Sequence, residues 1–277
     1  MRRVIDVCRA EALPQASSRP TSGSPPLCAG SAPPTWLEAA SASRYDSPVN
    51  RDFYQAVLAR LLEGEPTLAG RGLDLGCGTG FATELLVRRY PSVTWRGVDV
   101  AAPMLALARR KHGLASVGFC VAAAEALPLA DNSMDVVVCN FAWHWFGEAA
   151  AAEVRRILRP GGWLLASIPL RHFAAATGNR ALARVLLANR RRFVASRAQG
   201  LRHDAARAVL PGSVRVARHE LCVERETFAD GRELLEVLDS RGALRAIFGP
   251  HPPAALPALA GPDFVWSFAS VHLQVLG

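Results

Sequence analysis

The amino-acid sequence predicts an α/β protein: a doubly wound, seven-stranded, mostly parallel sheet with an antiparallel last strand and a helical lid insertion. Three observations predict this class. Short segments of strand type alternate along the chain with segments of helical periodicity. The segment Met134–Cys139 is apolar almost throughout, as expected of a strand with helices over both faces. A glycine-rich turn at residues 76–80 joins the first strand to the helix after it.

The predicted strands are short, and turn residues or helical segments separate them. Five of them fall in the first part of the chain and two after residue 213. Their ranges are 71–75, 92–99, 116–121, 134–139, 163–168, 214–225 and 264–275. We expect helices at 36–62, 81–90, 101–111, 148–158 and 232–240, the fourth ended by Arg159-Pro160-Gly161-Gly162.

The composition changes along the chain and divides it into four parts. Residues 1–35 are rich in Ala, Ser and Pro, which predicts a disordered or loosely docked arm. Residues 36–170 form the predicted cofactor-binding core, 171–212 a helical lid over the substrate, and 213–277 the C-terminal part of the sheet. The lid segment carries clustered arginines, of which one or two are candidates to bind a substrate carboxylate: Arg180, Arg184, Arg190, Arg191, Arg192, Arg197, Arg202 and Arg207.

The turn after the first strand carries the most specific motif, Asp74-Leu75-Gly76-Cys77-Gly78-Thr79-Gly80. Its glycines let a ligand touch the main chain along Gly76, Cys77, Gly78 and Gly80. The acid before them would repel a pyrophosphate but suits an amino group, and the N-terminus of the next helix suits a carboxylate. This favours S-adenosyl-L-methionine over a nicotinamide or flavin dinucleotide. A plain strand–helix turn without a ligand is the alternative.

A second acid, Asp99, ends the next predicted strand about 20 residues after the glycine loop. At this spacing a carboxylate meets the two hydroxyls of a ribose. Val100, directly after it, and Met104, on the following helix, join it as predicted cofactor-binding residues, with Met104 against the adenine. Capping of the helix N-terminus is an alternative role for Asp99, and core packing is the alternative for Met104.

The chain resembles the class I S-adenosylmethionine-dependent methyltransferases, over roughly residues 40–170. The resemblance implies a Rossmann-like methyltransferase fold, with Asp74 and the glycine loop holding the methionine end of the cofactor and Asp99 the ribose. Four motifs carry it, in the order of the family: Asp74–Gly80, Gly97-Val98-Asp99, Ala124-Glu125-Ala126-Leu127-Pro128 and Leu158-Arg159-Pro160-Gly161-Gly162.

The same resemblance implies three further cofactor-binding residues. Ala124 and Glu125 would lie near the adenine, and Asn140 would lie close to the reactive methyl group. The sequence departs from the family at Ala123, where many relatives carry an acid that contacts the adenine amino group. Adenine recognition would here rest on backbone groups.

A narrower resemblance is to the malonyl-carrier-protein O-methyltransferases of biotin synthesis and the small-molecule group around them, including trans-aconitate methyltransferases. These enzymes methylate free carboxylates, which implies an acidic acceptor, free or carrier-bound. Where the family often has Gln before the second tryptophan, this chain has His144. The matching segments are Tyr45-Asp46, Asn140-Phe141-Ala142-Trp143-His144-Trp145, Phe228–Leu235 and Val265-Trp266-Ser267-Phe268.

Two residues are candidates for catalysis. His144 follows the fourth strand at the expected mouth of the cleft, where it would serve as the general base for a phenol, amine or enol acceptor. A carboxylate acceptor needs no base. Tyr45 would fold over the cofactor and orient the acceptor. The alternatives are an aromatic-cluster role for His144, between Trp143 and Trp145, and helix packing for Tyr45.

The chain has a formal net charge of +8, and Lys111 is its only lysine. Basic charge keeps a nucleic-acid methyltransferase as a rival hypothesis. However, Asn140-Phe141-Ala142-Trp143 lacks the Asn/Asp-Pro-Pro-Tyr/Phe set that base N-methylases use. We therefore predict a small-molecule acceptor methylated on oxygen, and no nucleic-acid partner. A non-catalytic cofactor-binding subunit is the second rival.

The six cysteines, at positions 8, 28, 77, 120, 139 and 222, form no C-x-x-C pair, so no metal site is expected. Reduced thiols indicate a cytoplasmic setting. No apolar run is long enough to span a membrane, and residues 1–6 do not begin a secretory signal. The sequence leaves the oligomeric state open.

Overall fold

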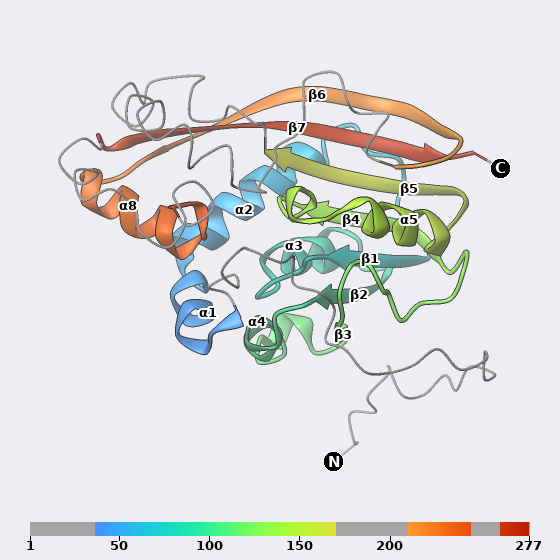
Figure 1. Ribbon diagram of the computed structural model, residues 1–277, viewed down its shortest axis with the longest axis horizontal. Coiled ribbons are helices and arrows are strands. Elements are labelled where there is room, and N and C mark those ends of the chain that lie inside the picture. The colour runs from blue at the N-terminus through green and yellow to red at the C-terminus, as the bar shows by residue number, and fades with distance from the viewer. Residues whose placement is uncertain (1–36, 170–209, 245–260, 277) are drawn as a thin grey trace, which may run out of the picture.

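The computed structural model describes residues 37–169, 210–244 and 261–276 (Figure 1). Its centre is a seven-stranded sheet with the strand order β3-β2-β1-β4-β5-β7-β6. Neighbouring strands from β3 to β5 pair in parallel, whereas β7 pairs antiparallel with both β5 and β6. The strands are β1 (Arg71–Leu75), β2 (Thr94–Asp99), β3 (Gly118–Val121), β4 (Met134–Asn140), β5 (Leu158–Pro169), β6 (Val214–Thr227) and β7 (Asp263–Val275).

This topology confirms the predicted mostly parallel sheet with an antiparallel last strand. Helices cover both faces of the sheet, and α1, α2 and α8 gather at one end of it (Figure 1). The helices within the described ranges are α1 (Ala39–Tyr45), α2 (Pro48–Leu61), α3 (Phe81–Arg89), α4 (Ala102–Ala108), α5 (Glu148–Ile157) and α8 (Gly231–Ser240), with short 3-10 turns at His112–Leu114 and Trp143–Trp145.

Strand β4 explains why its sequence is apolar throughout. Val137 and Cys139 pack with Val154 of α5 in one buried cluster. Val136 and Val138 pack with α2 and α3 in another, on the opposite face. Because successive side chains of a strand point to opposite faces, a strand between two helical layers must be apolar at every position.

The single helix expected at 36–62 is wrong. The chain breaks at Asp46, and a new helix, α2, begins at Pro48. The hydroxyl of Ser47 accepts a hydrogen bond from the N–H of Asn50 at 3.3 Å, which caps the new helix. Pro48 occupies the first helical turn and holds the residue before it in an extended conformation.

Two further boundaries differ from the expectation. Helix α4 ends at Ala108, and a 3-10 turn takes over at His112. Strand β5 begins at Leu158, so the Arg159–Gly162 segment expected as a loop lies inside the strand. The pairing of β4 with β5 shifts register between Met134 and Val136, and this irregularity accommodates the extra residues.

The arm at 1–35, and all but the last three residues of the lid at 171–212 with its arginine cluster, lie outside the described residues. Strands β6 and β7 form the antiparallel edge of the sheet. No helix in the described ranges is long and apolar enough to cross a membrane. Within the same ranges no group of His, Cys, Asp and Glu has the arrangement of a metal site.

Candidate functional site

The site lies where the order of the strands reverses. Strands β1 and β4 are hydrogen-bonded neighbours, yet β2 and β3 intervene between them along the chain. The connections that leave their carboxyl ends therefore go to opposite faces of the sheet, and open sheets bind ligands at such a point. Asp74, Asp99 and Asn140 lie at the ends of β1, β2 and β4.

The glycine loop packs against two other parts of the chain, the loop after β4 and the end of α1. Gly76 has φ 74°, and a Cβ there would lie 2.6 Å from the Cβ of Ala142, in the loop after β4. A Cβ on Gly78, with φ 54°, would come within 3.9 Å of the Tyr45 ring. Only a residue without a side chain allows both the left-handed conformation and the close approach at Gly76.

Most N–H groups of this loop already hold its shape. Those of Gly76 and Cys77 donate to the carbonyl of Val98, and that of Gly80 to the carbonyl of Cys77. The N–H of Gly78 donates to Asp99 at 2.8 Å. The free donors for an anionic group are therefore at the following helix N-terminus rather than on the glycines.

Asp74 is fully buried at the end of β1. Its Oδ2 accepts a hydrogen bond from the hydroxyl of Thr83, on α3, at 2.6 Å. Its Oδ1 has no hydrogen-bond partner among the described residues, and the same holds for the buried hydroxyl of Thr79. Burial raises the pKa of Asp74 to about 7, against the lowering effect of Thr83. A buried acceptor without a donor fits a ligand that brings an ammonium group.

Asp99 is also engaged with the main chain. Its Oδ2 accepts from Gly78 and its Oδ1 accepts from the N–H of Ala101 at 2.8 Å. Burial raises the pKa of Asp99, and these N–H donors oppose the rise. The carboxylate thus ties the end of β2 to the glycine loop and forms a turn before α4. Each oxygen keeps a second lone pair, which fits a ribose hydroxyl.

Apolar side chains are exposed at the ends of β2 and β3. Val100 is 44% exposed and Val121, which pairs with Asp99 in the sheet, is 47% exposed. Ala124 is buried and Glu125 is exposed in the loop after β3. Exposed valines beside the acid predicted to bind the ribose fit the flat face of an adenine. The sequence analysis did not identify Val121 as a candidate, because the sequence of a strand does not show which of its valines is left exposed in the fold.

Met104 is 4% exposed and packs with Ala42 of α1 and Ala101. These contacts with α1 correspond to the core-packing alternative given for Met104. Its predicted contact with adenine stays a prediction.

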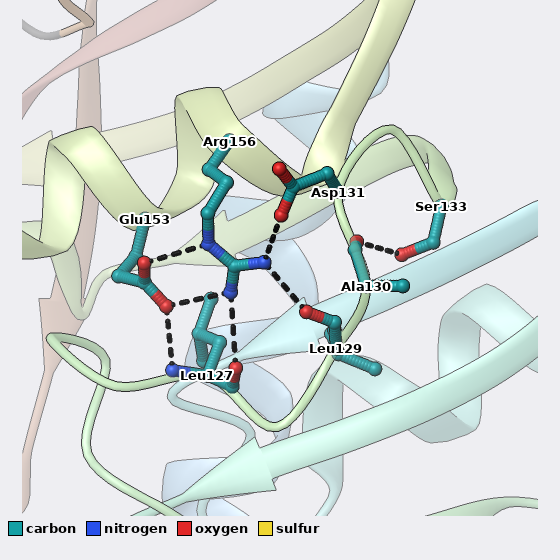
Figure 2. Close-up of polar contacts among 7 residues, drawn as sticks. All are labelled: Leu127, Leu129, Ala130, Asp131, Ser133, Glu153 and Arg156. Atoms are coloured by element: carbon teal, nitrogen blue, oxygen red, sulfur yellow. Dashed lines mark hydrogen bonds and ion pairs between the residues drawn. The ribbon is translucent and has the colours of Figure 1, made fainter. Parts of the chain in front are cut away.

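One guanidinium holds the loop that carries Ala124 (Figure 2). The Arg156 side chain, on α5, donates to the carbonyls of Leu127 and Leu129 at 3.1 and 2.7 Å. It also donates to both oxygens of Glu153 at 2.8 Å and to Asp131 at 2.7 Å. Glu153 in turn accepts from the N–H of Leu127 at 2.9 Å. Both polar backbone groups of Leu127 are therefore fixed to α5.

The Asn140 amide has a structural use. Its Nδ2 donates to the carbonyl of Tyr54 at 2.9 Å, and its Oδ1 accepts from the hydroxyl of Ser167 at 2.8 Å. The side chain thereby joins α2 to β4 and β5. That Asn140 lies next to the reactive methyl group stays a prediction. Its Nδ2 and Oδ1 are both engaged in these two contacts, so a ligand could use only their remaining hydrogen-bonding capacity.

His144 lies in the 3-10 turn after β4, in the aromatic cluster given as its alternative. Its ring centroid is 4.6 Å from that of Trp145 and 6.2 Å from that of Phe141. Burial lowers the pKa of His144 to about 3, so the imidazole is neutral at physiological pH. Its Nδ1 is buried and has no partner in the described part of the chain. A neutral imidazole whose Nδ1 has no hydrogen-bond partner is suited to contact a polar group of the methyl-accepting substrate. It is a poor base for removing a proton from that substrate.

Tyr45 covers the glycine loop from the end of α1. Its ring stacks on that of Phe81 at 5.7 Å and lies 5.5 Å from that of Tyr54. Burial, followed by the neighbouring Tyr54, raises the pKa of Tyr45 well above its usual value. Both phenols are therefore neutral, and together they form a roof, the Tyr45–Tyr54 pair, over the start of α3.

A separate cavity of about 590 Å³ lies between α2 and α3. Arg51, Asp52, Glu84 and Arg88 line it, and the cofactor candidates do not. Its mixed charges define no ligand class.

The reversal of strand order, the acid before a glycine loop and the second acid on the neighbouring strand together resemble the site of the class I S-adenosylmethionine-dependent methyltransferases. Residues 73–166 match the family model described as a methyltransferase domain.

Known proteins agree with this class. The malonyl-[acyl-carrier protein] O-methyltransferase of Methylococcus capsulatus is 39% identical over 130 residues, which cover 45% of this chain and 47% of that protein. An uncharacterized methyltransferase of Mycobacterium bovis is 45% identical over 100 residues, covering 36% of this chain and 40% of that protein. The chain thus spans less than half the length of these curated relatives.

A solved structure of a Bacillus halodurans C-125 protein, provisionally assigned as a methyltransferase, shares the fold with a TM-score of 0.56 at 16% identity. The match covers 80% of this chain and all of that one.

Proposed function

We propose that this chain transfers the methyl group of S-adenosyl-L-methionine to a carboxylate oxygen of a small acid, either free or attached to a carrier. The observation that carries the proposal is the buried, half-satisfied carboxyl group of Asp74 beside the glycine loop. The bound cofactor supplies an electrophilic methyl group on a sulfonium sulfur.

The residues of the site divide the work of binding. Asp74 accepts from the ammonium group of the methionine end, and the N-terminus of α3 takes its carboxylate. Asp99 accepts from the ribose hydroxyls, while Val100, Val121 and the loop at Ala124 enclose the adenine. Glu125, whose side chain is exposed, acts through its backbone.

A carboxylate acceptor agrees with the state of His144. With a pKa of about 3, this imidazole is a poor base at neutral pH, and a carboxylate needs none. We propose that the open Nδ1 of His144 contacts the acceptor, and that Tyr45 excludes water above the methionine end. Similarity to relatives named for a carrier-bound malonyl acceptor supports an acidic acceptor.

A nucleic-acid acceptor would use unpaired basic groups. In the described ranges many arginines face acids instead, among them Arg44 with Asp239, Arg89 with Glu65, and Arg159 with Asp135. These pairings favour a small molecule over a polyanion.

The test is transfer of a labelled methyl group by the purified chain to free dicarboxylic acids, malonyl thioesters and phenols. We expect label in the acids, released as volatile methanol by mild base because the product is an ester. Base-stable label in a phenol would move the acceptor to a hydroxyl. Absence of turnover with every acceptor, in a chain that binds the cofactor, would favour the non-catalytic subunit.

A further inference from the structure

Two asparagines each hold the main chain of one member of the Tyr45–Tyr54 pair. The Nδ2 of Asn50 donates to the carbonyl of Tyr45 at 2.8 Å. The Nδ2 of Asn140 donates to the carbonyl of Tyr54 at 2.9 Å. The Tyr45 ring, which lies next to Gly78, and the Tyr54 ring beside it are therefore anchored through their backbones, independently of their own side-chain contacts.

The anchor at Asn50 reaches the C-terminal part of the sheet. Asn50 is fully buried, and its Oδ1 accepts from the Nε of Arg241 at 2.7 Å. Its Nδ2 also donates to the hydroxyl of Ser240 at 3.0 Å. Arg241 and Ser240 lie at the end of α8, so one amide group joins α8 to the carbonyl at the end of α1.

Arg241 is itself buried and fully committed. It is 6% exposed, and its two terminal nitrogens bind the two oxygens of Glu226, on β6. Its guanidinium lies 4.1 Å above the ring of Phe53. Glu226 also accepts from the indole N–H of Trp266, on β7, at 2.8 Å. Because Glu226 and Phe53 hold the guanidinium of Arg241 in place, its Nε has a fixed position and direction.

A buried ion pair of this kind gives little net stability, because apolar side chains of the same volume would do as well. The ion pair instead fixes positions. The hydrogen bonds from Glu226 through Arg241 to Asn50 fix the position of the Tyr45 carbonyl, and with it the Tyr45 ring next to Gly78. The exposed ion pair between Arg44 and Asp239 joins the same two helices, α1 and α8, at 3.1 Å without such constraint.

We propose that Asn50 and Arg241 are positioning residues for methyl transfer, which hold the Tyr45–Tyr54 pair over the methionine end of the cofactor site. The proposal rests on the function proposed above. It goes beyond that function by assigning the placement of the roof to Asn50 on α2 and to Arg241 directly after α8, neither of which is among the proposed cofactor-binding residues.

The test uses Asn50→Asp in the full chain. This variant keeps an acceptor for Arg241 but replaces the donor to Tyr45 by an oxygen. We expect the Kd of S-adenosylhomocysteine, measured by calorimetry, to rise about tenfold, and kcat to fall by a similar factor, because a buried carbonyl loses its partner and the roof shifts. Arg241→Lys, which keeps the charge beside Glu226 and loses the Nε donor, should show the same direction of change.

Two controls separate placement from stability. Arg44→Ala breaks the exposed link between the same helices and should change Kd less than twofold. Leu238→Ala removes a fully buried side chain of α8 and should lower the melting temperature without raising Kd more than twofold.

Wild-type affinity in both Asn50→Asp and Arg241→Lys would overturn the proposal and leave the function standing. Equal weakening in Leu238→Ala would also overturn it, since loss of stability alone would then account for the effect. A wild-type chain that binds no S-adenosylhomocysteine would overturn both the proposal and the function.

Discussion

Asp74 is the residue on which the site depends, and its burial has a cost. Its folded pKa of about 7 lies above the ordinary value of 3.8 that the carboxyl group has in the unfolded chain. Between these values the unfolded state gives up a proton that the folded state keeps, so stability falls as pH rises through this window. A buried carboxyl group that destabilises the folded state indicates a functional site, and we expect a bound ligand to offset this destabilisation.

Asp74→Asn tests this directly. Asn keeps an oxygen for the Thr83 hydroxyl but cannot ionise. We expect the ligand-free variant to melt about 5 °C higher than the wild type at pH 8, with a much smaller difference at pH 5. Thermal unfolding at the two pH values gives the answer. A wild type as stable as the variant at pH 8 would mean that Asp74 has a polar partner in solution.

His144 gives a second prediction at this scale. A histidine with a pKa of about 3 does not act as the base at neutral pH, so its loss should affect binding of the acceptor more than turnover. For His144→Phe we expect the KM of an acid acceptor to rise about tenfold with kcat changed less than about threefold. Steady-state kinetics with saturating cofactor measure both. A fall of kcat by a factor of 10² or more would restore the general-base role.

Among the elements, the loop after β3 is the one that we propose to bind the adenine. Ala123 stands where the family resemblance implies an acid, so in this proposal recognition rests on backbone groups. Those groups need a fixed loop, and Arg156 with Glu153 provides it through both polar groups of Leu127. Sequence reasoning missed this pair, because arginine and glutamate three residues apart on a helix also describe any solvated helix face.

For Arg156→Lys we expect the Kd of S-adenosylhomocysteine to rise about fivefold with kcat changed less than twofold. An ammonium group has only three donors on one atom, too few for both oxygens of Glu153, Asp131 and the two carbonyls that the guanidinium bonds together. The matched control is Arg159→Lys, because Arg159 pairs with Asp135 at 2.7 Å outside the loop and is largely exposed. Calorimetry on both variants decides the matter. Equal Kd values for the two would remove the loop from adenine binding.

The boundaries of the elements show what local sequence carries. Strand β1 and the start of α3 fall where the glycine loop predicts them, because strand, turn and helix signals there agree. The break before α2 was missed although Ser47 and Pro48 are a capping pair, since the apolar periodicity runs on through it. The early start of β5 depends on pairing with β4, which no local signal contains.

At the scale of the whole molecule, the parallel core and the two acids at its strand ends could be predicted from one sequence. The residues that we propose to position the Tyr45–Tyr54 pair could not. Asn50 and Arg241 are 191 positions apart and meet only because β6, α8 and β7 return to the N-terminal helices. Nothing in their spacing indicates contact, and the same is true of Asn140 with the carbonyl of Tyr54.

Calorimetric titration of the chain with S-adenosylhomocysteine tests the central claim most directly. We expect one binding site per chain in the wild type and no measurable binding when Asp74 and Asp99 are both replaced by alanine, with the fold retained. Binding of the double variant with wild-type affinity, or no binding by the wild type, would contradict the claim that these two carboxylates hold the cofactor.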